Sequence, residues 1–416
     1  MPTDERMTIN ERRKYLKVMR PRYQKAGRKE KQHLLTEMEA VTGLHRKSLV
    51  RLLRHPDALE RKPRKRQRGR KYDHHLDDAL RVIAETLDYV CAERLQPVLV
   101  ATAERLAQHG ELDLTPAVRD QLAAISISTV RRRLARLLQD VPKLPRKRPS
   151  RGRSLTRDIP MGRIPWDEAT PGHFETDLVH HCGDMTVGEY VHTLQMVDVA
   201  TGWSERVAVF GRSERAMKGG FSQIEKRVPF EIREIHPDNG NEFFNQHMLR
   251  YFRDKVPNAH LSRSRPYQKN DNRIVEQKND TLVRAFFGSA RFDTLEHLRL
   301  LNRLYDKMWL YYNFFQPVLH LTEKERVDDG QGRIRFRRKW DNAQTPFDRV
   351  CAAQILDEAT HARLTALRDR TNPRQLRREI YQLRDQLLDL PLATGIQDVI
   401  AELSHADAER EAILFP

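Results

Sequence analysis

Two short basic runs, in which apolar residues are nearly absent, divide the 416-residue chain into three parts. Residues 61–71 carry eight cations and no acid, and residues 143–157 carry seven cations and no acid. Proline and glycine interrupt both runs, so neither run is suited to a core helix or strand. We therefore expect basic linkers at residues 61–72 and 141–165, with folded segments before, between and after them.

These two runs hold fifteen of the seventeen excess positive charges of the chain. Cationic segments of this kind displace counterions from nucleic-acid phosphates. A purely solubilising role is the alternative for one isolated run, but two runs between folded segments favour a nucleic-acid partner.

The cysteines exclude several classes of protein. Cys91, Cys182 and Cys351 form an odd, widely spaced set that fits neither a disulfide framework nor a zinc pattern. The run His180-His181-Cys182 offers soft-metal ligands, but adjacent residues alternate across a strand, so we interpret it as structural. The sequence also has no run of about 18 apolar residues and no signal-peptide core. We expect a cytoplasmic, nucleoid-associated protein.

Residues 1–60 have the pattern of a helix-turn-helix module. Helices are predicted at residues 31–41 and 45–54, with Gly43 suited to the turn between them. The residues expected to pack inside are Met38, Leu44, Leu49, Leu52 and Leu53, which leaves Arg46, Lys47, Arg51 and Arg54 exposed to DNA. A plain helical hairpin is the alternative.

Residues 73–140 are predicted to form a second helical DNA-binding module. Helical periodicity covers residues 73–87, 97–108, 116–124 and 129–138. The last helix places its basic residues Arg131, Arg132, Arg133 and Arg136 opposite the apolar Val130, Leu134 and Leu137. An ordinary amphipathic surface helix is the alternative.

After the second linker, strands and helices alternate. The predicted strands are residues 174–180, 193–199, 204–210, 232–236 and 259–264, and the predicted helices are residues 213–227, 242–255 and 266–287. This order predicts an α/β, ribonuclease-H-like core with a mixed five-stranded sheet at residues 166–320.

Residues 321–416 show no chemistry of their own. An aromatic-rich helix at residues 295–313 precedes this region, a short strand pair is predicted within residues 333–340, and helices resume from residue 346, including residues 372–388. We expect a mainly α-helical region whose role in docking, target-DNA contact or self-association stays open.

Three carboxylates occur where a phosphodiester-cleaving metal site needs them. Asp177 lies within a predicted strand, Asp238 follows another strand directly, and Glu276 lies on a predicted helix. Magnesium prefers a few hard carboxylate oxygens, and two ions about 4 Å apart can flank a reacting phosphorus. These three acids are therefore the candidate catalytic and metal-ligating residues.

Each candidate acid has an alternative interpretation. Glu175 shares a strand face with Asp177, and Asp198 closes a predicted turn, so either could be the ligand in place of Asp177. Asp238 could belong only to an Asp-Asn-Gly turn, and Glu276 could be a solvated helix acid.

The helix around Glu276 has two distinct stripes. Asn272, Glu276 and Asn279 are predicted to share one face, and Val275, Leu282 and Phe286 another. One stripe can then enter the core while the other meets metal and DNA. The flanking basic residues predicted to hold the substrate strand are Lys269, Arg273 and Lys278.

Four motifs, in order along the chain, carry a family resemblance. They are residues 166–177 (WDEATPGHFETD), 201–203 (TGW), 238–243 (DNGNEF), and 264–272 (SRPYQKNDN) followed by 275–279 (VEQKN). Over residues 160–320 the chain resembles bacterial Asp-Asp-Glu (DDE) transposases with a retroviral-integrase-type catalytic core. The resemblance implies a ribonuclease-H-like fold, two Mg²⁺ or Mn²⁺ ions, terminal-repeat binding by the N-terminal modules, and the catalytic triad Asp177, Asp238 and Glu276.

The chain departs from the family pattern in two places. Only Cys91 precedes residue 182, so the His-His-Cys-Cys zinc module of the retroviral relatives cannot form, and helix-turn-helix modules would replace it. Where some relatives carry a basic residue four positions after the glutamate, this chain has Asp280, so Lys278 or Arg284 would have to serve.

The resulting hypothesis is a DNA transposase or integrase. One strand would be hydrolysed at an element end, and the freed 3′-hydroxyl would attack target DNA without a covalent protein intermediate. Because paired ends must meet, we expect a homo-oligomer, at least a dimer, on terminal-repeat and target DNA. The alternatives are a non-enzymatic helix-turn-helix regulator and a ribonuclease-H-like nuclease that does not join strands.

Overall fold

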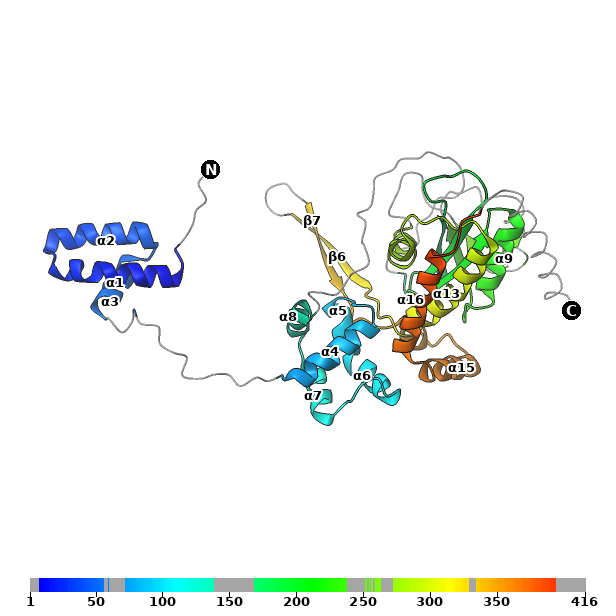
Figure 1. Ribbon diagram of the computed structural model, residues 1–416, viewed down its shortest axis with the longest axis horizontal. Coiled ribbons are helices and arrows are strands. Elements are labelled where there is room, and N and C mark those ends of the chain that lie inside the picture. Colours follow the sequence, from blue (N-terminus) through cyan, green and yellow to red (C-terminus); the bar gives the residue numbers. More distant parts are fainter. Residues whose placement is uncertain are drawn as a thin grey trace. The chain divides into compact units, whose positions relative to one another are not determined.

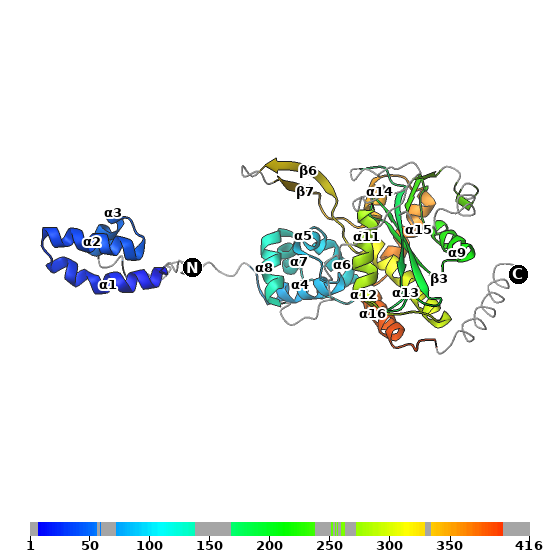
Figure 2. The same ribbon diagram turned by 90° about the horizontal axis from the view of Figure 1, so that it is seen from above.

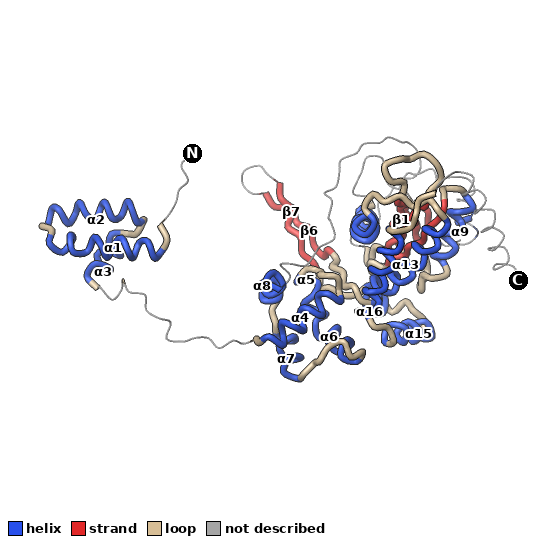
Figure 3. Tube along the Cα trace, viewed as in Figure 1, coloured by secondary structure: helices blue, strands red, loops and turns tan. Residues whose placement is uncertain are grey.

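The computed structural model describes residues 7–55, 59, 72–137, 168–237, 251–252, 254, 256, 259–262, 272–328 and 334–393. The chain forms two compact units, Met1–Lys71 and Tyr72–Pro416 (Figure 1, Figure 3). Most of both predicted linkers lies outside the described residues. No helix among those described is long and apolar enough to span a membrane.

The first unit is a small three-helix assembly of α1 (Ile9–Lys25), α2 (Arg28–Thr42) and α3 (Arg46–Arg54). The α1 helix begins at a capping box formed by Thr8 and Glu11. The α2 helix ends at Gly43, whose φ of 67° is the left-handed conformation that glycine adopts most easily. The core of this first unit consists mainly of Leu16, Leu34, Leu35, Met38, Leu49 and Leu53. Both predicted helices and the glycine turn are thus confirmed, and α1 is an addition.

The second unit begins with a bundle of helices, whose bounds follow. They are α4 (His74–Thr86), α5 (Ala92–Leu95), the 3₁₀ turn η2 (Gln96–Val98), α6 (Leu99–Gln108), α7 (Pro116–Ala124) and α8 (Ile127–Leu137). Asp73 and Thr115 cap α4 and α7 by accepting hydrogen bonds from backbone N–H groups of the first turn. The predicted helices are confirmed, and α8 begins two residues earlier than predicted.

A mixed five-stranded sheet is the centre of the second unit. Its strands are β1 (His173–His180), β2 (Val191–Asp198), β3 (Ser204–Phe210), β4 (Glu234–Pro237) and β5 (His260–Leu261). Their order is β3-β2-β1-β4-β5. The first three strands are antiparallel, and β4 runs parallel to both β1 and β5. The predicted mixed sheet is therefore confirmed.

Helices cover both faces of this sheet, as Figure 2 shows. On one face, α9 (Glu214–Glu225) packs Met217, Phe221 and Ile224 into a core with apolar residues of β1 to β4. On the other face lie α11 (Arg273–Asn279), the π-helical segment η3 (Asp280–Arg284), α12 (Ala285–Phe287) and α13 (Leu295–Phe314). The sheet is thus a buried layer, and α11 lies directly on β1 and β2.

The helix predicted at residues 266–287 differs from the observed structure. Residues 263–271 lie outside the described residues, and the remainder is interrupted by η3 rather than being uniformly α-helical. The π-helical geometry is rare and local, and side-chain periodicity does not predict it. Most of the helix predicted at residues 242–255 also lies outside the described residues.

The C-terminal region contains a two-stranded ribbon and three helices. Strand β6 (Leu321–Asp328) pairs antiparallel with β7 (Ile334–Trp340), followed by α14 (Pro346–Ala352), α15 (Glu358–Asp369) and α16 (Pro373–Leu388). The prediction of a strand pair within residues 333–340 was wrong, because only β7 lies there. Strand β6 escaped prediction because glutamate, lysine and aspartate are depleted in strands.

One hydrophobic core joins helices α4 to α8 to the sheet and the C-terminal helices. The α16 helix packs against both α13 and α4. Polar contacts reinforce this junction: the Tyr311 hydroxyl donates to the Thr86 carbonyl at 2.6 Å, and Gln316 Nε2 donates to the Leu87 carbonyl at 2.8 Å. The helical bundle is therefore held in a fixed position against the sheet.

Candidate active site and nucleic-acid interface

Asp177 lies in the middle of β1, on the face that α11 covers. Its Oδ2 accepts a hydrogen bond from Asn279 Nδ2 of α11 at 2.6 Å, and its Oδ1 accepts one from the Leu178 N–H at 2.9 Å. The side chain is half-buried. Asp177 is therefore oriented by its neighbours at the boundary between the core and the solvent.

Glu276 is exposed on α11, and Glu175 fixes the start of that helix. Glu175 Oε2 accepts hydrogen bonds from the backbone N–H groups of Ile274 at 2.7 Å and Val275 at 2.9 Å. Glu175 and Asp177 lie two residues apart on β1, so both project from the same face of the sheet. These contacts hold α11 across β1 before and after Glu276. The structure thus brings Glu276 and Asp177 to the same side of the sheet.

The third predicted acid, Asp238, lies outside the described residues, as does Lys269. The strand that precedes Asp238 is described: β4 runs parallel to β1, with Pro237 opposite Thr176. Among the described residues, no three His, Cys, Asp or Glu side chains are grouped so that they could hold a metal ion.

The two acids that compete with Asp177 both have clear structural contacts. Glu175 is only 2% exposed, and burial raises its pKa to about 7 against the opposing effect of its two backbone hydrogen bonds. Asp198 is fully buried and accepts hydrogen bonds from Gly172 N–H and from the N–H and hydroxyl of Thr201. Burial raises its pKa to about 6. Asp198 thus closes the turn between β2 and β3.

Replacing Glu175 by Ala should destabilise the second unit by about 2 kcal/mol, because one buried and one half-buried N–H group at the start of α11 lose their acceptor. Chemical denaturation of the full chain measures this free energy. Glu175→Gln retains an acceptor oxygen and should be destabilised less. Equal stability of Glu175→Ala and the unsubstituted chain would show that this contact does not hold α11.

The predicted solvent-facing stripe on α11 was partly wrong. Asn272 and Asn279 are buried, with Asn279 only 1% exposed, whereas Glu276 is exposed. Asn279 faces the sheet because its amide meets Asp177 there. The apolar stripe was correct, since Val275, Leu282 and Phe286 are all buried.

A polar row that the sequence analysis missed extends from Asp177 across the sheet. Gln195 of β2 stands opposite Asp177, and Arg206 of β3 stands opposite Gln195. Arg206 is 1% exposed, donates to Ser204 Oγ at 2.9 Å, and lies over the Tyr312 ring. Burial lowers the pKa of Arg206 to about 10. A cation in the middle of a strand was the available signal for this row.

The basic residues of α11 and η3 differ in their surroundings. Lys278 is half-buried, and desolvation, with the nearby Arg94 and Arg206, lowers its pKa to about 7. Arg273 is half-buried at the start of the helix. Arg284 forms an exposed ion pair with Asp280 at 3.3 Å. Lys278, rather than Arg284, therefore lies in a cationic environment.

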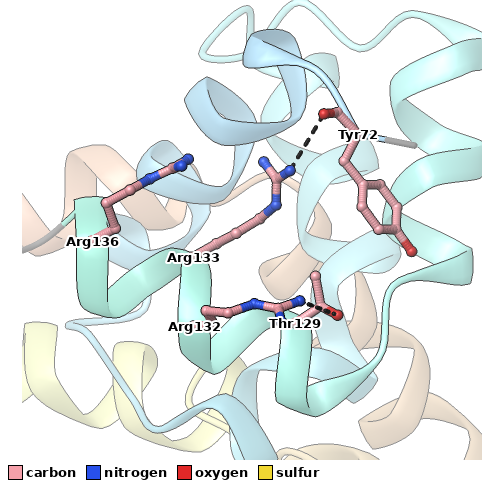
Figure 4. Close-up of a pocket in the computed structure, with 5 residues that line it drawn as sticks. All are labelled: Tyr72, Thr129, Arg132, Arg133 and Arg136. Carbon is pink, nitrogen blue, oxygen red and sulfur yellow. Dashed lines mark hydrogen bonds between the residues drawn. The ribbon is translucent and has the colours of Figure 1, made fainter. Parts of the chain in front are cut away.

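A pocket of about 210 Å³ lies against α8 (Figure 4). Its lining residues are Tyr72, Thr129, Arg132, Arg133 and Arg136. Arg133 is half-buried, forms an ion pair with Asp77 and donates to the Tyr72 carbonyl at 3.3 Å. Arg136 reaches the same Asp77 carboxylate at 2.8 Å. Three arginines line the pocket and two of them share the Asp77 carboxylate, whereas Arg132 donates to Thr129 Oγ1, so the pocket is net positive.

The other predicted DNA-contact residues divide into exposed and internally bonded ones. On α3, Lys47 and Arg51 are exposed, whereas Arg46 is half-buried and donates to the Gln32 carbonyl at 3.1 Å. On α8, Arg131 is exposed and forms an ion pair with Glu93.

The His180-His181-Cys182 run divides its side chains between the surface and the core. His181 is buried, contacts the rings of Phe287 and Phe292, and shares a 2.8 Å hydrogen bond with Thr193 Oγ1. Burial lowers its pKa to about 3. His180 is exposed on the strand. The alternation expected for adjacent strand residues is therefore present.

Comparisons with known proteins give a relative by sequence and a weak likeness by structure. No protein-family model matches the chain. A protein of Sinorhizobium fredii (strain NBRC 101917 / NGR234), described as uncharacterized protein y4rM, is 34% identical over 323 residues, which are 77% of this chain and 91% of the relative. Among solved structures, the catalytic core domain of BIV integrase aligns with 13% identity and a TM-score of 0.28, over 44% of this chain and 95% of that chain. The identity to y4rM extends over most of both sequences, and this chain belongs to the same family as that protein.

Proposed function

We propose that this protein is a DDE-type DNA transposase or integrase that cleaves DNA at element ends and joins the freed 3′-hydroxyl to target DNA. The observation that carries the proposal is the fixing of α11 across β1. Glu175 and Asn279 hold the helix on either side of Glu276, next to Asp177. The motif resemblance over residues 160–320 assigns these two acids, with Asp238, to the catalytic triad.

The chemistry of the donor set fits a hard divalent cation. Asp177, Glu276 and Asp238 would supply carboxylate oxygens, which Mg²⁺ and Mn²⁺ prefer. An ionised carboxylate has about four acceptor positions, so one carboxylate can bind a metal ion and accept hydrogen bonds at the same time. Two bound ions would stabilise the attacking and leaving oxygens of the phosphodiester.

The surrounding residues would position the acids and the DNA strand. Asn279 keeps the Asp177 carboxylate turned toward α11, and Glu175 keeps α11 at a fixed height above β1. Arg273 and Lys278 flank Glu276 and can neutralise substrate phosphates. A low pKa for Lys278 in the free protein would rise when a phosphate approaches, because the anion favours the charged amine.

The helical regions would bind the ends of the element. The turn between α2 and α3 and the one between α7 and α8 are both compatible with helix-turn-helix binding, with α3 and α8 facing DNA. The proposed DNA contacts are Arg46, Lys47, Arg51, Arg131, Arg132, Arg133, Lys269, Arg273 and Lys278. A homo-oligomer would hold two ends together.

Replacing Asn279 by Ala should lower metal-dependent cleavage by about 10- to 100-fold, because a partner that orients a metal ligand is lost. The Mg²⁺ concentration for half-maximal cleavage should rise, whereas the affinity for terminal-repeat DNA should not change. Titrating cleavage with Mg²⁺ separates this positioning role from a general loss of stability. An Asn279→Ala variant with an unchanged Mg²⁺ requirement would contradict the role.

The proposed function is tested by incubating the purified chain with labelled terminal-repeat DNA, a target plasmid and Mg²⁺. Inverted repeats in the DNA that flanks the gene supply the substrate sequence. Joined product is the expected result. Binding alone would indicate a regulator, and cleavage without joining would indicate a nuclease.

A further inference from the structure

The ribbon of β6 and β7 is separated from the body of the second unit. Its strands pack mainly against each other, and neither makes an extensive contact with another described helix or strand. Figure 1 and Figure 2 both show the ribbon projecting from the rest of its unit. A two-stranded ribbon alone is marginally stable in water. Packing within the core therefore does not account for this arm, and a role outside the core is needed to explain it.

The base of the ribbon is firmly anchored. The Asp341 N–H donates to the His320 carbonyl at 3.0 Å, and the His320 N–H donates to Asp341 Oδ1 at 2.8 Å. Arg349 pairs with the same Asp341 carboxylate at 2.7 Å and donates to the Val318 carbonyl at 3.1 Å. The direction in which the ribbon leaves the body is thus set by the fold.

On one face of the ribbon, the strand register places acids opposite two of the three cations. Glu323 stands opposite Lys339, with 3.7 Å between their charged atoms, and Glu325 stands opposite Arg337. Residues directly opposite each other in an antiparallel pair share a face. We call this face the compensated face, and its third cation, Arg335, stands opposite Val327.

On the other face, the register of the paired residues places no acid opposite a cation. Lys324 stands opposite Arg338, and Arg326 stands opposite Phe336. Alternation along β7 adds Trp340, which is 51% exposed, to this face, while Asp328 at the far end of β6 is its one acid. We call it the basic face. Like charges directly opposite each other destabilise a ribbon, so an anion from a partner molecule would stabilise the basic face.

We propose that the ribbon is a DNA-binding arm whose basic face contacts the phosphates of duplex DNA. The proposal rests on the proposed function, which makes DNA the substrate. The major groove of DNA admits a two-stranded ribbon, and cations interspersed with aromatic residues suit contact with phosphates and sugars. The arm gives residues 321–340 a role that the catalytic site does not provide.

The sharpest test compares two neighbouring arginines of β7 on opposite faces. Arg338→Ala removes a cation from the basic face, and Arg337→Ala removes one from the compensated face, so the net charge changes equally. Both side chains are exposed. Arg338→Ala should weaken binding of the full chain to duplex DNA by about tenfold and lower the salt slope of log Kd by about 0.9, whereas Arg337→Ala should change affinity by less than about twofold.

Fluorescence anisotropy with labelled duplex at several salt concentrations measures both quantities, and thermal melting checks that the two variants are equally folded. An equal loss of DNA affinity in the two variants, or no loss in either, would overturn the proposal of a DNA-binding arm. Tighter binding to duplex RNA of the same length would overturn it as well. The strand-transfer assay on the unsubstituted chain keeps the two proposals apart. A chain that joins DNA but shows no difference between Arg338→Ala and Arg337→Ala retains its function without this arm. A chain that joins no DNA but loses duplex binding only in Arg338→Ala retains the arm alone.

Discussion

Asp177→Asn will lower DNA cleavage and strand transfer by at least about a thousandfold and leave terminal-repeat binding unchanged. Asparagine has nearly the same shape and keeps one oxygen that can accept a hydrogen bond, so the substitution removes mainly the negative charge. A thousandfold loss corresponds to about 4 kcal/mol in the activation barrier, at about 1.4 kcal/mol for each factor of ten. Glu276→Gln should act in the same way, because the two acids are proposed to share the same ions.

The matched control is Asp280→Asn, which removes a carboxylate immediately after α11. Asp280 is exposed and pairs with Arg284 at 3.3 Å across one helical turn, an arrangement that contributes little to stability. Its activity should stay within about twofold of the unsubstituted chain, since it is not a proposed ligand. Gel electrophoresis of cleaved and joined products measures all variants together. Strand transfer retained by Asp177→Asn would remove Asp177 from the catalytic site.

Arg227→Ala will lower the free energy of unfolding by about 3 to 5 kcal/mol, because it leaves a buried carboxylate without its cation. Glu205 is 0% exposed, and its Oε2 lies 3.0 Å from Arg227 Nε. Its Oε1 accepts hydrogen bonds from the indole N–H groups of Trp203 at 2.9 Å and Trp309 at 2.7 Å. Chemical denaturation measures the loss, which should fall on the second unit.

The loss of stability in Arg227→Ala should grow as the pH rises. Burial raises the pKa of Glu205, and Arg227 opposes that rise, so the pKa will be higher still in Arg227→Ala. When the pKa of an acid is higher in the folded state than in the unfolded state, the folded state becomes less stable as the pH rises from the unfolded pKa through the folded pKa. Arg227→Ala should therefore be more destabilised at pH 8 than at pH 5. Adding Glu205→Gln to Arg227→Ala should remove this pH dependence, and a pH-independent loss in Arg227→Ala alone would contradict the account.

Side-chain patterns were sufficient for the sheet because its strands alternate or run apolar and the breaks between them carry turn residues. The three strands around Asp177 have buried apolar residues on the α9 face, and the breaks between them carry turn residues such as Asp198 and Gly202. The same regularity placed Asp177 within a strand and Glu276 on a helix. Strand periodicity alone could not decide between Glu175 and Asp177, since both lie on one face of β1, and the preference for Asp177 came from its motif context. The hydrogen bonds of Glu175 to α11 give it a structural role.

Other features depend on contacts between distant segments and could not be predicted. Asn279 was assigned to a solvent-facing stripe because periodicity alone does not reveal that Asp177 lies beneath it. The fixed position of helices α4 to α8 depends on pairs such as Asp88 with Arg377 at 2.9 Å and with the Tyr381 hydroxyl at 2.7 Å. These partners are separated by 289 and 293 residues, respectively, far beyond any local pattern. Strand β6 was missed because its charged residues have low strand propensity.

The central claim is that Asp177 and Glu276 share divalent ions over a scissile phosphate. Crystals of the chain bound to terminal-repeat DNA, grown with Mn²⁺ and measured at the manganese absorption edge, test it most directly. The account predicts anomalous peaks about 2.1 Å from carboxylate oxygens of both Asp177 and Glu276, with Asp238 completing the site. Peaks that no oxygen of Asp177 or Glu276 approaches, or ions bound by one of these acids and never by both, would contradict it.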